Sequence, residues 1–435
     1  MAYSVDRRIG IISLGCDKNR VDSEKLAGLL AGSGFQIVWL EDPEPMNLKA
    51  LIINTCGFIQ SAKGESVNTI LDAVELKAEG YYQSLYVMGC LVERYKQILP
   101  EEIPEVDGWF GPEAFLDVLK TLGGRCDKKP ERILSSPQHY AYLKVSEGCN
   151  RKCAFCAIPL MRGKFRSKPI EEIVEEANNL SRQGVKELVL VAQDMSMYGA
   201  DLYGKPALAE LALKLSELQE IDWIRFHYLY PRPFPFDLVE LMHPSKSKVV
   251  PYIDMPVQHG SDEMLKRMRR ATSRQYLLDI IKKMRDINPD IVFRTTFIVG
   301  FPGETDKHFE ELLSFIELTR PERMGVFPYS HEEDTYAYKH FKDDVPEEVK
   351  EVRATEAMTL YSKLVSQWMK TQIGKKVPVI IDSVTSDYAM GHSWWESPDV
   401  DPSVLLPPDV NLYTGQLIEA TLTGFDSLDW FAERA

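Results

Sequence analysis

Three cysteines within eight residues constrain this chain more than any other feature of its sequence. Cys149, Cys153 and Cys156 follow the spacing C-x3-C-x2-C, in a chain of 435 residues that has only seven cysteines. Structural zinc takes four ligands, usually from two cysteine pairs, and no second pair follows here. Three cysteines also cannot pair off among themselves as disulfides. Three thiolates without a fourth suit a [4Fe-4S] cluster whose remaining iron is open to a non-protein ligand.

The composition is that of a folded protein in a reducing compartment. Hydrophobic residues make up 44% of the chain and charged residues 27%, which is ordinary for a soluble protein of two to four domains. The N-terminus lacks a signal-peptide pattern, and no window approaches the ~20 apolar residues of a membrane span. We therefore expect a cytoplasmic protein with reduced cysteines and no membrane partner. The formal net charge of −14 favours a basic partner over bulk nucleic acid.

The first 128 residues alternate short apolar runs with helical patterns, and each run ends at a cysteine. The cysteines are Cys16, Cys56 and Cys90, whereas Cys126 has no such context and is expected to be a bystander. The runs span residues 9–15, 50–55 and 84–89, and the helical patterns span residues 19–31 and 61–78. This alternation predicts a parallel sheet covered on both faces. Ligands of such sheets bind at the carboxyl ends of the strands, so we expect a second three-cysteine cluster there.

Residues 137–371 are predicted to form an open (β/α)6 partial barrel followed by a linker helix. An eight-unit barrel takes ~250 residues, which scales to about 190 for six units, and the span from Ala141 to Pro328 fits six. The linker helix is expected over residues 345–371 and stops at Gly374. The six strands are expected near residues 141–145, 187–192, 223–229, 251–255, 291–298 and 324–328.

The loops after these strands are expected to carry the chemistry, as they do in complete barrels. The cluster loop is the first of them. Later loops offer Gln193 and Asp194, the stretch from Met255 to Gly260, and Gly300-Phe301-Pro302-Gly303-Glu304. His227 and His259 are interpreted as hydrogen-bonded core residues rather than catalytic ones. Around the cluster loop lies a group of cations that would favour a reduced cluster, form a solvated surface or meet an acidic substrate. They are Arg151, Lys152, Arg162, Lys164, Arg166 and Lys168.

Residues 372–435 are predicted to form a small antiparallel β-barrel. Strands are expected over residues 377–382, 388–395 and 416–423. This region has three cations against ten acidic residues, half of the formal charge of the whole chain. RNA-binding β-barrels use Lys and Arg on phosphates, so this charge favours a basic protein surface instead.

The cluster loop resembles the signature of the radical S-adenosylmethionine (SAM) enzymes. Residues 146–163 and the three N-terminal cysteines resemble the methylthiotransferase branch of that family, as do Met255–Gly260 and Phe327-Pro328-Tyr329-Ser330, and residues 372–435 resemble its TRAM module. Residues 13–24, SLGCDKNRVDSE, are most similar to the branch that modifies an aspartate of a ribosomal protein. After Ser330 the chain reads His-Glu-Glu-Asp-Thr, where the tRNA-modifying relatives are expected to carry a basic residue and a glycine.

The resemblance implies an enzyme with two [4Fe-4S] clusters and SAM. Cys149, Cys153 and Cys156 would hold the cluster that binds and cleaves SAM, and Cys16, Cys56 and Cys90 would hold a second cluster carrying sulfide or methylsulfide. The resulting radical would take hydrogen from the β-carbon of an aspartate in a basic small-subunit ribosomal protein, S twelve, met either alone or on the assembled ribosome. A second SAM would supply the methyl group, and an electron donor would reduce the cluster. Candidate SAM contacts are Gln193, Asp194, Gly300, Gly303 and Glu304, with no catalytic residue expected beyond the cluster ligands.

Two other functions fit parts of this pattern. A tRNA adenosine methylthiotransferase shares the cysteines but calls for a basic C-terminal module. A non-catalytic iron–sulfur protein, either an electron carrier or a ribosome-associated module, leaves the six-unit barrel and the open iron unexplained.

Overall fold

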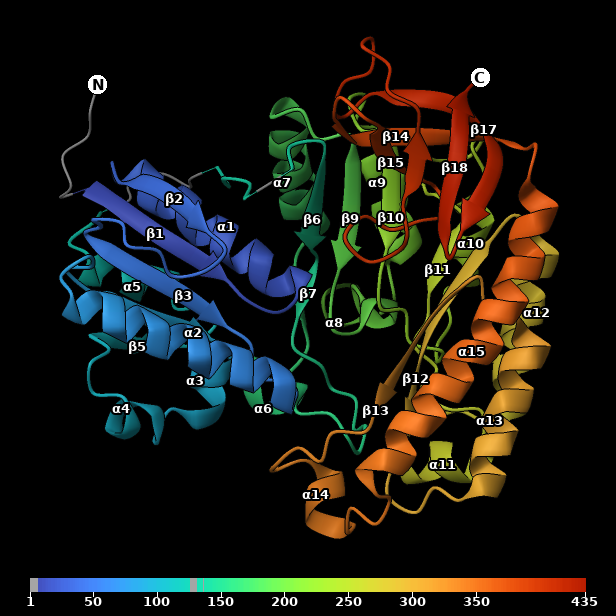
Figure 1. Ribbon diagram of the computed structural model, residues 1–435, viewed down its shortest axis with the longest axis horizontal. Coiled ribbons are helices and arrows are strands. Elements are labelled where there is room, and N and C mark those ends of the chain that lie inside the picture. The colour runs from blue at the N-terminus through green and yellow to red at the C-terminus, as the bar shows by residue number, and fades with distance from the viewer. Residues whose placement is uncertain (1–6, 126–130, 136) are drawn as a thin grey trace. The chain divides into compact units, whose positions relative to one another are not determined.

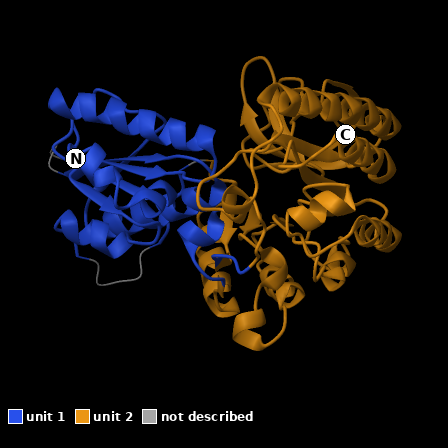
Figure 2. Cartoon of the chain, turned by 90° about the horizontal axis from the view of Figure 1, so that it is seen from below, with its two compact units in different colours: residues 1–136, 147–150, 157–165 blue, residues 137–146, 151–156, 166–435 orange. Residues whose placement is uncertain are grey.

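The computed structural model describes residues 7–125, 131–135 and 137–435 and forms two compact units (Figures 1 and 2). Unit 1 comprises residues 1–136, 147–150 and 157–165, and unit 2 comprises residues 137–146, 151–156 and 166–435. The loop that carries Cys149, Cys153 and Cys156 therefore contributes residues to both units.

Unit 1 is built on a five-stranded parallel sheet with the strand order β2-β1-β3-β4-β5. The strands are β1 (Arg8–Ser13), β2 (Gln36–Leu40), β3 (Ala50–Thr55), β4 (Leu85–Gly89) and β5 (Gly108–Phe110). The helices are α1 (Asp17–Gly32), α2 (Gln60–Ala78), α3 (Cys90–Tyr95), α4 (Leu99–Glu102), α5 (Phe115–Thr121) and α6 (Ile158–Arg162). The predicted parallel sheet is confirmed, and it gains two strands, β2 and β5, that the sequence did not indicate.

Alternate residues of the central strands supply two hydrophobic cores, one on each face of this sheet. In β3, Ala50 and Ile52 pack with α1 and α5, whereas Leu51 and Ile53 pack with α2 and α3. Successive side chains of a strand point to opposite faces, so a fully apolar run needs both faces covered. The carboxyl edge therefore belongs to a sheet whose central strands are buried on both faces.

Unit 2 contains the predicted six-strand partial barrel, as two three-stranded parallel sheets with the orders β10-β9-β6 and β11-β12-β13. Its strands are β6 (Tyr140–Lys144), β9 (Glu187–Val191), β10 (Trp223–Phe226), β11 (Tyr252–Asp254), β12 (Val292–Val299) and β13 (Arg323–Pro328). Two short strands flank the cluster loop, β7 (Ser146–Glu147) and β8 (Arg166–Ser167). Each barrel strand matches an expected one to within a few residues.

Helices follow each barrel strand in the chain, as the strand–helix alternation predicts. They are α7 (Ile170–Arg182), α8 (Ala200–Tyr203), α9 (Leu208–Ser216), α10 (Phe236–Leu241), α11 (Asp262–Arg267), α12 (Arg274–Ile287), α13 (Asp306–Thr319), α14 (Tyr336–His340) and α15 (Glu347–Gln372), with one 3-10 turn at η2 (Met195–Met197). The long helix α15 is the predicted linker helix, and it ends two residues before Gly374, whose φ is +88°.

The C-terminal residues form a closed five-stranded barrel in the order β14-β15-β16-β18-β17. Its strands are β14 (Lys376–Val384), β15 (Ala389–Ser393), β16 (Val404–Leu406), β17 (Leu417–Asp426) and β18 (Asp429–Arg434). The expected antiparallel arrangement needs one correction, because β16 and β18 pair in parallel. A closed ring with an odd number of strands cannot alternate direction throughout, so at least one pair must be parallel.

The segment 393–401 of the closed barrel lies against the amino-terminal ends of the partial-barrel strands. Arg225 of β10 donates to the carbonyls of Ser393 and Trp394 at 3.4 and 3.0 Å. Tyr252, the first residue of β11, donates to the carboxylate of Asp401. These contacts tie the closed barrel to the partial-barrel strands, and the chemistry of such barrels lies at the opposite, carboxyl end.

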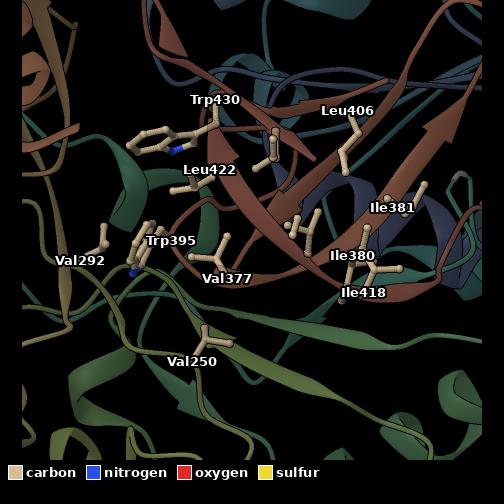
Figure 3. Close-up of a cluster of buried hydrophobic side chains, with 14 of the residues drawn as sticks. Val250, Val292, Val377, Ile380, Ile381, Trp395, Leu406, Ile418, Leu422 and Trp430 are labelled. Atoms are coloured by element: carbon tan, nitrogen blue, oxygen red, sulfur yellow. The ribbon is translucent and has the colours of Figure 1, made fainter. Parts of the chain in front are cut away.

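A shared hydrophobic core joins the same two parts of unit 2 (Figure 3). Val250 and Val292 of the partial barrel belong to one buried cluster with Trp395 and Trp430 of the closed barrel. Tyr361 and Met369 of α15 complete this cluster from the linker helix. Continuous apolar packing of this kind means that the closed barrel is an integral part of unit 2.

Candidate functional site

Cys16, Cys56 and Cys90 all follow strands that end at the carboxyl edge of the sheet in unit 1. β1 and β3 pair in parallel up to Ser13 and Asn54, and β3 and β4 pair up to the last residue of each strand. Since the three strands are neighbours, the cysteines that follow them come to one edge. Cys56 and Cys90 are buried, and Cys16 is exposed.

Glycines allow the three cysteine loops to pack closely. Gly15 has a φ of +84°, and a Cβ added to it would lie 2.6 Å from the Cβ of Cys56. A Cβ added to Gly57 would lie 2.8 Å from the backbone nitrogen of Leu91, directly after Cys90. Neither distance leaves room for a side chain, so glycine is required at both positions. This crowding holds the three loops together at the sheet edge.

Burial keeps two of these thiols neutral in the metal-free chain. Burial raises the pKa of Cys90 to about 12, although the neighbouring Arg162 acts in the opposite direction. Burial also raises the pKa of Cys56. Metal ligation requires thiolates, so cluster assembly must release these protons. A buried, thiol-rich edge suits an iron–sulfur cluster, and the three cysteines fit one by their chemistry.

Arg162 is the centre of a buried polar network beside Cys90. Its Nε donates to Sγ of Cys90 at 3.1 Å, and its Nη1 donates to Asp22 at 2.6 Å and to Glu147 at 3.2 Å. Its Nη2 donates to the side-chain oxygen of Asn19. Arg162 was one of the cations expected around the cluster loop, but it is buried rather than part of a solvated surface.

Asn19 links this network to the strand ends. Its amide nitrogen donates to the carbonyls of Leu14 and Thr55, each at 3.0 Å. Asn19 and Asp22 lie one turn apart on the buried face of α1, which explains why this stretch of the sequence is rich in buried polar residues. Next to the network is a pocket of about 260 Å³, lined by Glu93, Gly111, Pro112, Glu113, Ala114, Glu147, Met161 and Arg162.

The first part of the cluster loop is held within unit 1. The backbone nitrogen of buried Cys149 donates to the carbonyl of Gly163 at 3.2 Å. Gly148 has a φ of +71°, and a Cβ there would lie 2.2 Å from the carbonyl oxygen of Lys164. The residue before the first cysteine must therefore be glycine.

The second part of the cluster loop is held within unit 2. Arg270 donates to Sγ of Cys153 at 3.4 Å and to the carbonyl of Pro256 at 2.6 Å. Between Cys153 and Cys156, Ala154 bonds through its backbone to Met268 and Ala337 at 2.9 and 2.8 Å. The stretch from Met255 to Gly260, noted in the sequence, thus contributes a carbonyl that orients Arg270.

Tyr230 connects this arginine to a second one. The guanidinium carbons of Arg151 and Arg270 lie 3.9 and 4.2 Å from the centre of its ring. Arg151 also pairs with the buried Asp194 at 2.6 Å. Burial raises the pKa of Asp194, and the charge of Arg151 opposes that shift. A cationic, aromatic-lined region suits an anionic or aromatic ligand at the barrel rim.

The five residues predicted to contact SAM occupy two loops of unit 2. Gln193 and Asp194 lie two and three residues after the end of β9, and Gly300, Gly303 and Glu304 follow β12. Glu304 is buried, and its carboxylate accepts from the backbone of Gly300 at 2.9 Å and from Arg353 at 2.9 Å. A Cβ at Gly300 would lie 2.2 Å from the side chain of Lys350, so that glycine serves packing against α15. The role of the five in binding SAM stays a prediction.

His259 and His227 are buried and hydrogen-bonded, as expected of core histidines. His259 lies 3.2 Å from Glu304 and accepts from the backbone of Ser261 at 3.0 Å. His227 bonds to Ser397 of the closed barrel at 2.8 Å.

The described part of the chain holds neither a site for a single metal ion nor a membrane-spanning helix. No three His, Cys, Asp or Glu side chains there converge tightly enough to hold a single metal ion, whereas a cubane spreads its ligands over different irons. No helix among the described residues is long and apolar enough to cross a membrane. Cys126 lies outside the described residues.

Known proteins match this chain from end to end. The family model of the Radical SAM superfamily matches residues 143–316, that of the TRAM domain matches residues 373–434, and that of the uncharacterized protein family UPF0004 matches residues 8–111. The ribosomal protein uS12 methylthiotransferase RimO of Porphyromonas gingivalis is 43% identical over 429 residues, 98% of each chain. Those of Christiangramia forsetii and Bacteroides thetaiotaomicron are 45% and 44% identical, each over 98% of this chain and over 94% and 98% of their own length.

The chain belongs to the radical SAM methylthiotransferase family. The resemblance found in the sequence is thereby confirmed over the whole chain rather than in the motifs alone. Among solved structures, the radical SAM methyltransferase TsrM of Kitasatospora setae has a TM-score of 0.55 at 12% identity, covering 74% of this chain and 75% of its own. The cobalamin-dependent SAM radical enzyme OxsB has a TM-score of 0.51 at 14% identity, covering 82% of this chain and 56% of its own. These two structures show the fold alone.

Sequence reasoning missed the contacts of Arg162 and Arg270 with the cysteine sulfurs, and it missed Tyr230 altogether. The two sulfur contacts join residues 72 and 117 positions apart, and Tyr230 lies 79 and 40 positions from Arg151 and Arg270. Clustered arginines were the available signal, but a local pattern cannot tell an exposed arginine from a buried one.

Proposed function

We propose that this chain inserts a methylthio group at the β-carbon of an aspartate in a basic small-subunit ribosomal protein, uS12. One observation carries the proposal, namely identity of 43–45% over almost the whole chain to methylthiotransferases named for that substrate. Two sets of three cysteines supply the metal ligands that such a reaction requires. We place this reaction in the cytoplasm, where thiols stay reduced.

Cys149, Cys153 and Cys156 are assigned to the SAM-cleaving cluster, and Cys16, Cys56 and Cys90 to a second [4Fe-4S] cluster. When bound, the clusters and SAM supply the radical and the sulfur that side chains cannot provide. The chain's own residues shape the surroundings. Arg270 donates a hydrogen bond to the sulfur of Cys153 in the first set, and Arg162 donates one to the sulfur of Cys90 in the second.

Tyr230 orients the arginine that contacts the first set, and further loop residues would bind SAM. Tyr230 accepts from the backbone of Ala271, the residue after Arg270, and its ring lies against that guanidinium. Gln193 and Asp194, together with the loop that contains Gly300, Gly303 and Glu304, are our candidates for SAM binding. Within that loop, Glu304 would act by fixing the backbone of Gly300.

The charge of the closed barrel supports a basic protein substrate over tRNA. Three of its acidic residues are committed inside unit 2, where Asp382 pairs with His392, Glu396 with Arg323, and Asp401 with Arg294. Other acidic residues remain exposed, among them Asp387, Asp426 and Glu433. Exposed carboxylates attract lysine and arginine and repel phosphate.

Comparing variants of the two cysteine sets tests the assignment. Cys149→Ala should abolish 5′-deoxyadenosine formation from SAM. Cys56→Ala should keep SAM cleavage detectable while methylthiolation of uS12 is lost. Each variant is the matched control for the other, because each removes one ligand from one set. Full methylthiolation by Cys56→Ala would refute the second cluster.

Two further measurements separate this function from its rivals. Mass spectrometry of uS12 and of tRNA, each incubated with the reconstituted protein and an electron donor, should find the added methylthio mass on the protein alone. Iron analysis should give about eight irons per chain for two clusters, against about four for one. A chain that produces no 5′-deoxyadenosine after reduction would instead be a non-catalytic iron–sulfur protein.

A further inference from the structure

Arg162 has a fixed position beside Cys90 that the proposed chemistry does not by itself require. Its side chain is 3% exposed, and each of its three nitrogens makes a hydrogen bond. Nη1 reaches Asp22 and Glu147, and Nη2 reaches Asn19. Because these acceptors fix the plane of the guanidinium, the Nε–H is aimed at the sulfur of Cys90.

The orientation of this network argues for more than a structural ion pair. Asp22 and Glu147 bind the Nη1 end of the guanidinium, whereas Cys90 is bonded to Nε. Two carboxylates in direct contact with Nη1 offset the charge of Arg162 but leave the Nε–H dipole pointing at the sulfur. Packing supports the same placement, since Cys90 forms a small buried cluster with Ala157 and Met161 of the segment that carries Arg162.

We propose that Arg162 sets the reduction potential of the second cluster through its hydrogen bond to Cys90. The inference rests on the proposed function, which assigns that cluster to Cys16, Cys56 and Cys90. Hydrogen bonds to cysteine sulfurs are among the factors that set the potentials of iron–sulfur clusters. A cationic N–H donor stabilises the reduced state, which carries one more negative charge. Arg162 therefore raises the potential, and its removal lowers it.

The size of the effect follows from the strength of one charge-assisted hydrogen bond. Such a bond changes an equilibrium by about tenfold, and tenfold in a one-electron reduction is about 59 mV. The shift should be confined to the second cluster, because the sulfur that Arg162 contacts belongs to Cys90 of the second set, whereas Arg270 contacts Cys153 of the first.

The experiment isolates the second cluster in the full-length chain. Replacing Cys149, Cys153 and Cys156 with alanine removes the first set and leaves the other three cysteines. In this background, iron analysis counts the remaining cluster, and electron paramagnetic resonance during a redox titration gives its midpoint potential. An iron content far below about four per chain would overturn the second-cluster assignment and this inference with it.

Three variants in that background decide the question. Arg162→Gln with Asp22→Asn removes the sulfur donor and also neutralises the carboxylate nearest to Nη1, so that only Glu147 loses its ion pair with Arg162. It should bind full iron and reduce at a potential lower by about 59 mV, tenfold in the equilibrium. Arg162→Lys keeps a cation without the fork and should give an intermediate potential.

Arg270→Gln is the matched control, since it removes an arginine that contacts the absent first set. It should leave the potential of the second cluster unchanged. A wild-type potential in the Arg162→Gln/Asp22→Asn protein at full iron content would overturn the inference while the second cluster stands. An equal shift in Arg270→Gln would overturn it as well, because the effect would then be one of general charge.

Discussion

His392 of the closed barrel should make the stability of unit 2 depend on pH above neutrality. Its Nε2 lies 2.6 Å from Glu187, the first residue of β9, and its Nδ1 lies 2.8 Å from Asp382. The two carboxylates raise the pKa of this buried imidazole to about 9, against an ordinary value of 6.5. His392 is therefore a buried cation between two anions at neutral pH.

The sign and size of the effect follow from linkage. A pKa raised by folding contributes stability that is complete below about pH 6.5 and is lost as the pH rises through 9. At 1.36 kcal/mol for each pH unit between the two values, the contribution is about 3 kcal/mol. The pKa values of Glu187 and Asp382 are lowered by the same contacts, so their contribution is lost only in acid and stays constant over this window.

Urea unfolding of wild type and His392→Gln at pH 6 and pH 9.5 measures the contribution of His392 to the free energy of unfolding. Tryptophan fluorescence is a suitable signal, because Trp395 and Trp430 belong to the core that the closed barrel shares with the partial barrel. Wild type should lose about 3 kcal/mol more than His392→Gln between the two pH values. Comparing the two proteins cancels groups that titrate in both.

His243 provides the control for losing a histidine. It is exposed and its ring bonds to the neighbouring Ser245, so His243→Gln should keep the wild-type pH dependence. Titration of the His392 ring by nuclear magnetic resonance gives the pKa directly. The reasoning is refuted if that ring titrates at or below pH 6.5, or if His392→Gln retains the wild-type loss of stability.

Three further changes test the site and the substrate surface. Gly15→Ala forces a methyl group against Cys56 at a φ of +84°. It should lower the measured iron content from about eight toward about four per chain, and an unchanged iron content would contradict the packing argument. Tyr230→Leu removes a ring that contacts two guanidinium groups and should weaken SAM binding by about tenfold in calorimetry. Tyr230→Phe keeps the ring and is the control. Equal SAM affinities of Tyr230→Leu and wild type would contradict the argument. Replacing the exposed Asp387, Asp426 and Glu433 with lysine should slow association with uS12 by about tenfold or more in stopped-flow measurements. Faster binding would argue for an acidic ligand.

The parts of the fold that the sequence predicts are those with local signals. The strands that end at Cys56 and Cys90 are continuous apolar runs, and parallel pairing then places their ends together without further information. The short strand β5, Gly108–Phe110, has no such run and exists because Tyr86–Met88 offers it a partner. In β18, the buried Trp430 and Ala432 alternate with exposed residues. This alternation is typical of a strand, yet β18 was not among the three strands predicted for the C-terminal region.

The environment of the cysteines depends on contacts that no local pattern contains. Arg162 is one of several cations near the cluster loop, and its burial depends on Asp22, 140 residues earlier. The same is true of Tyr230, which becomes part of the site only because Arg151 and Arg270 converge on it. Metal ligands can be predicted from spacing, whereas the donors that adjust them are determined by tertiary structure.

The acidic character of the C-terminal region also changes meaning once the structure is known. Its excess of acidic residues was interpreted as a surface for a basic partner, yet Asp382, Glu396 and Asp401 face cations inside unit 2. Part of the charge therefore fastens the closed barrel to the amino end of the partial barrel. Of the exposed cations, Lys376 and Arg434 are paired with Glu419 and Asp409. The exposed acidic residues that remain outnumber Lys375, so the preference for a basic substrate survives on fewer residues than the composition suggested.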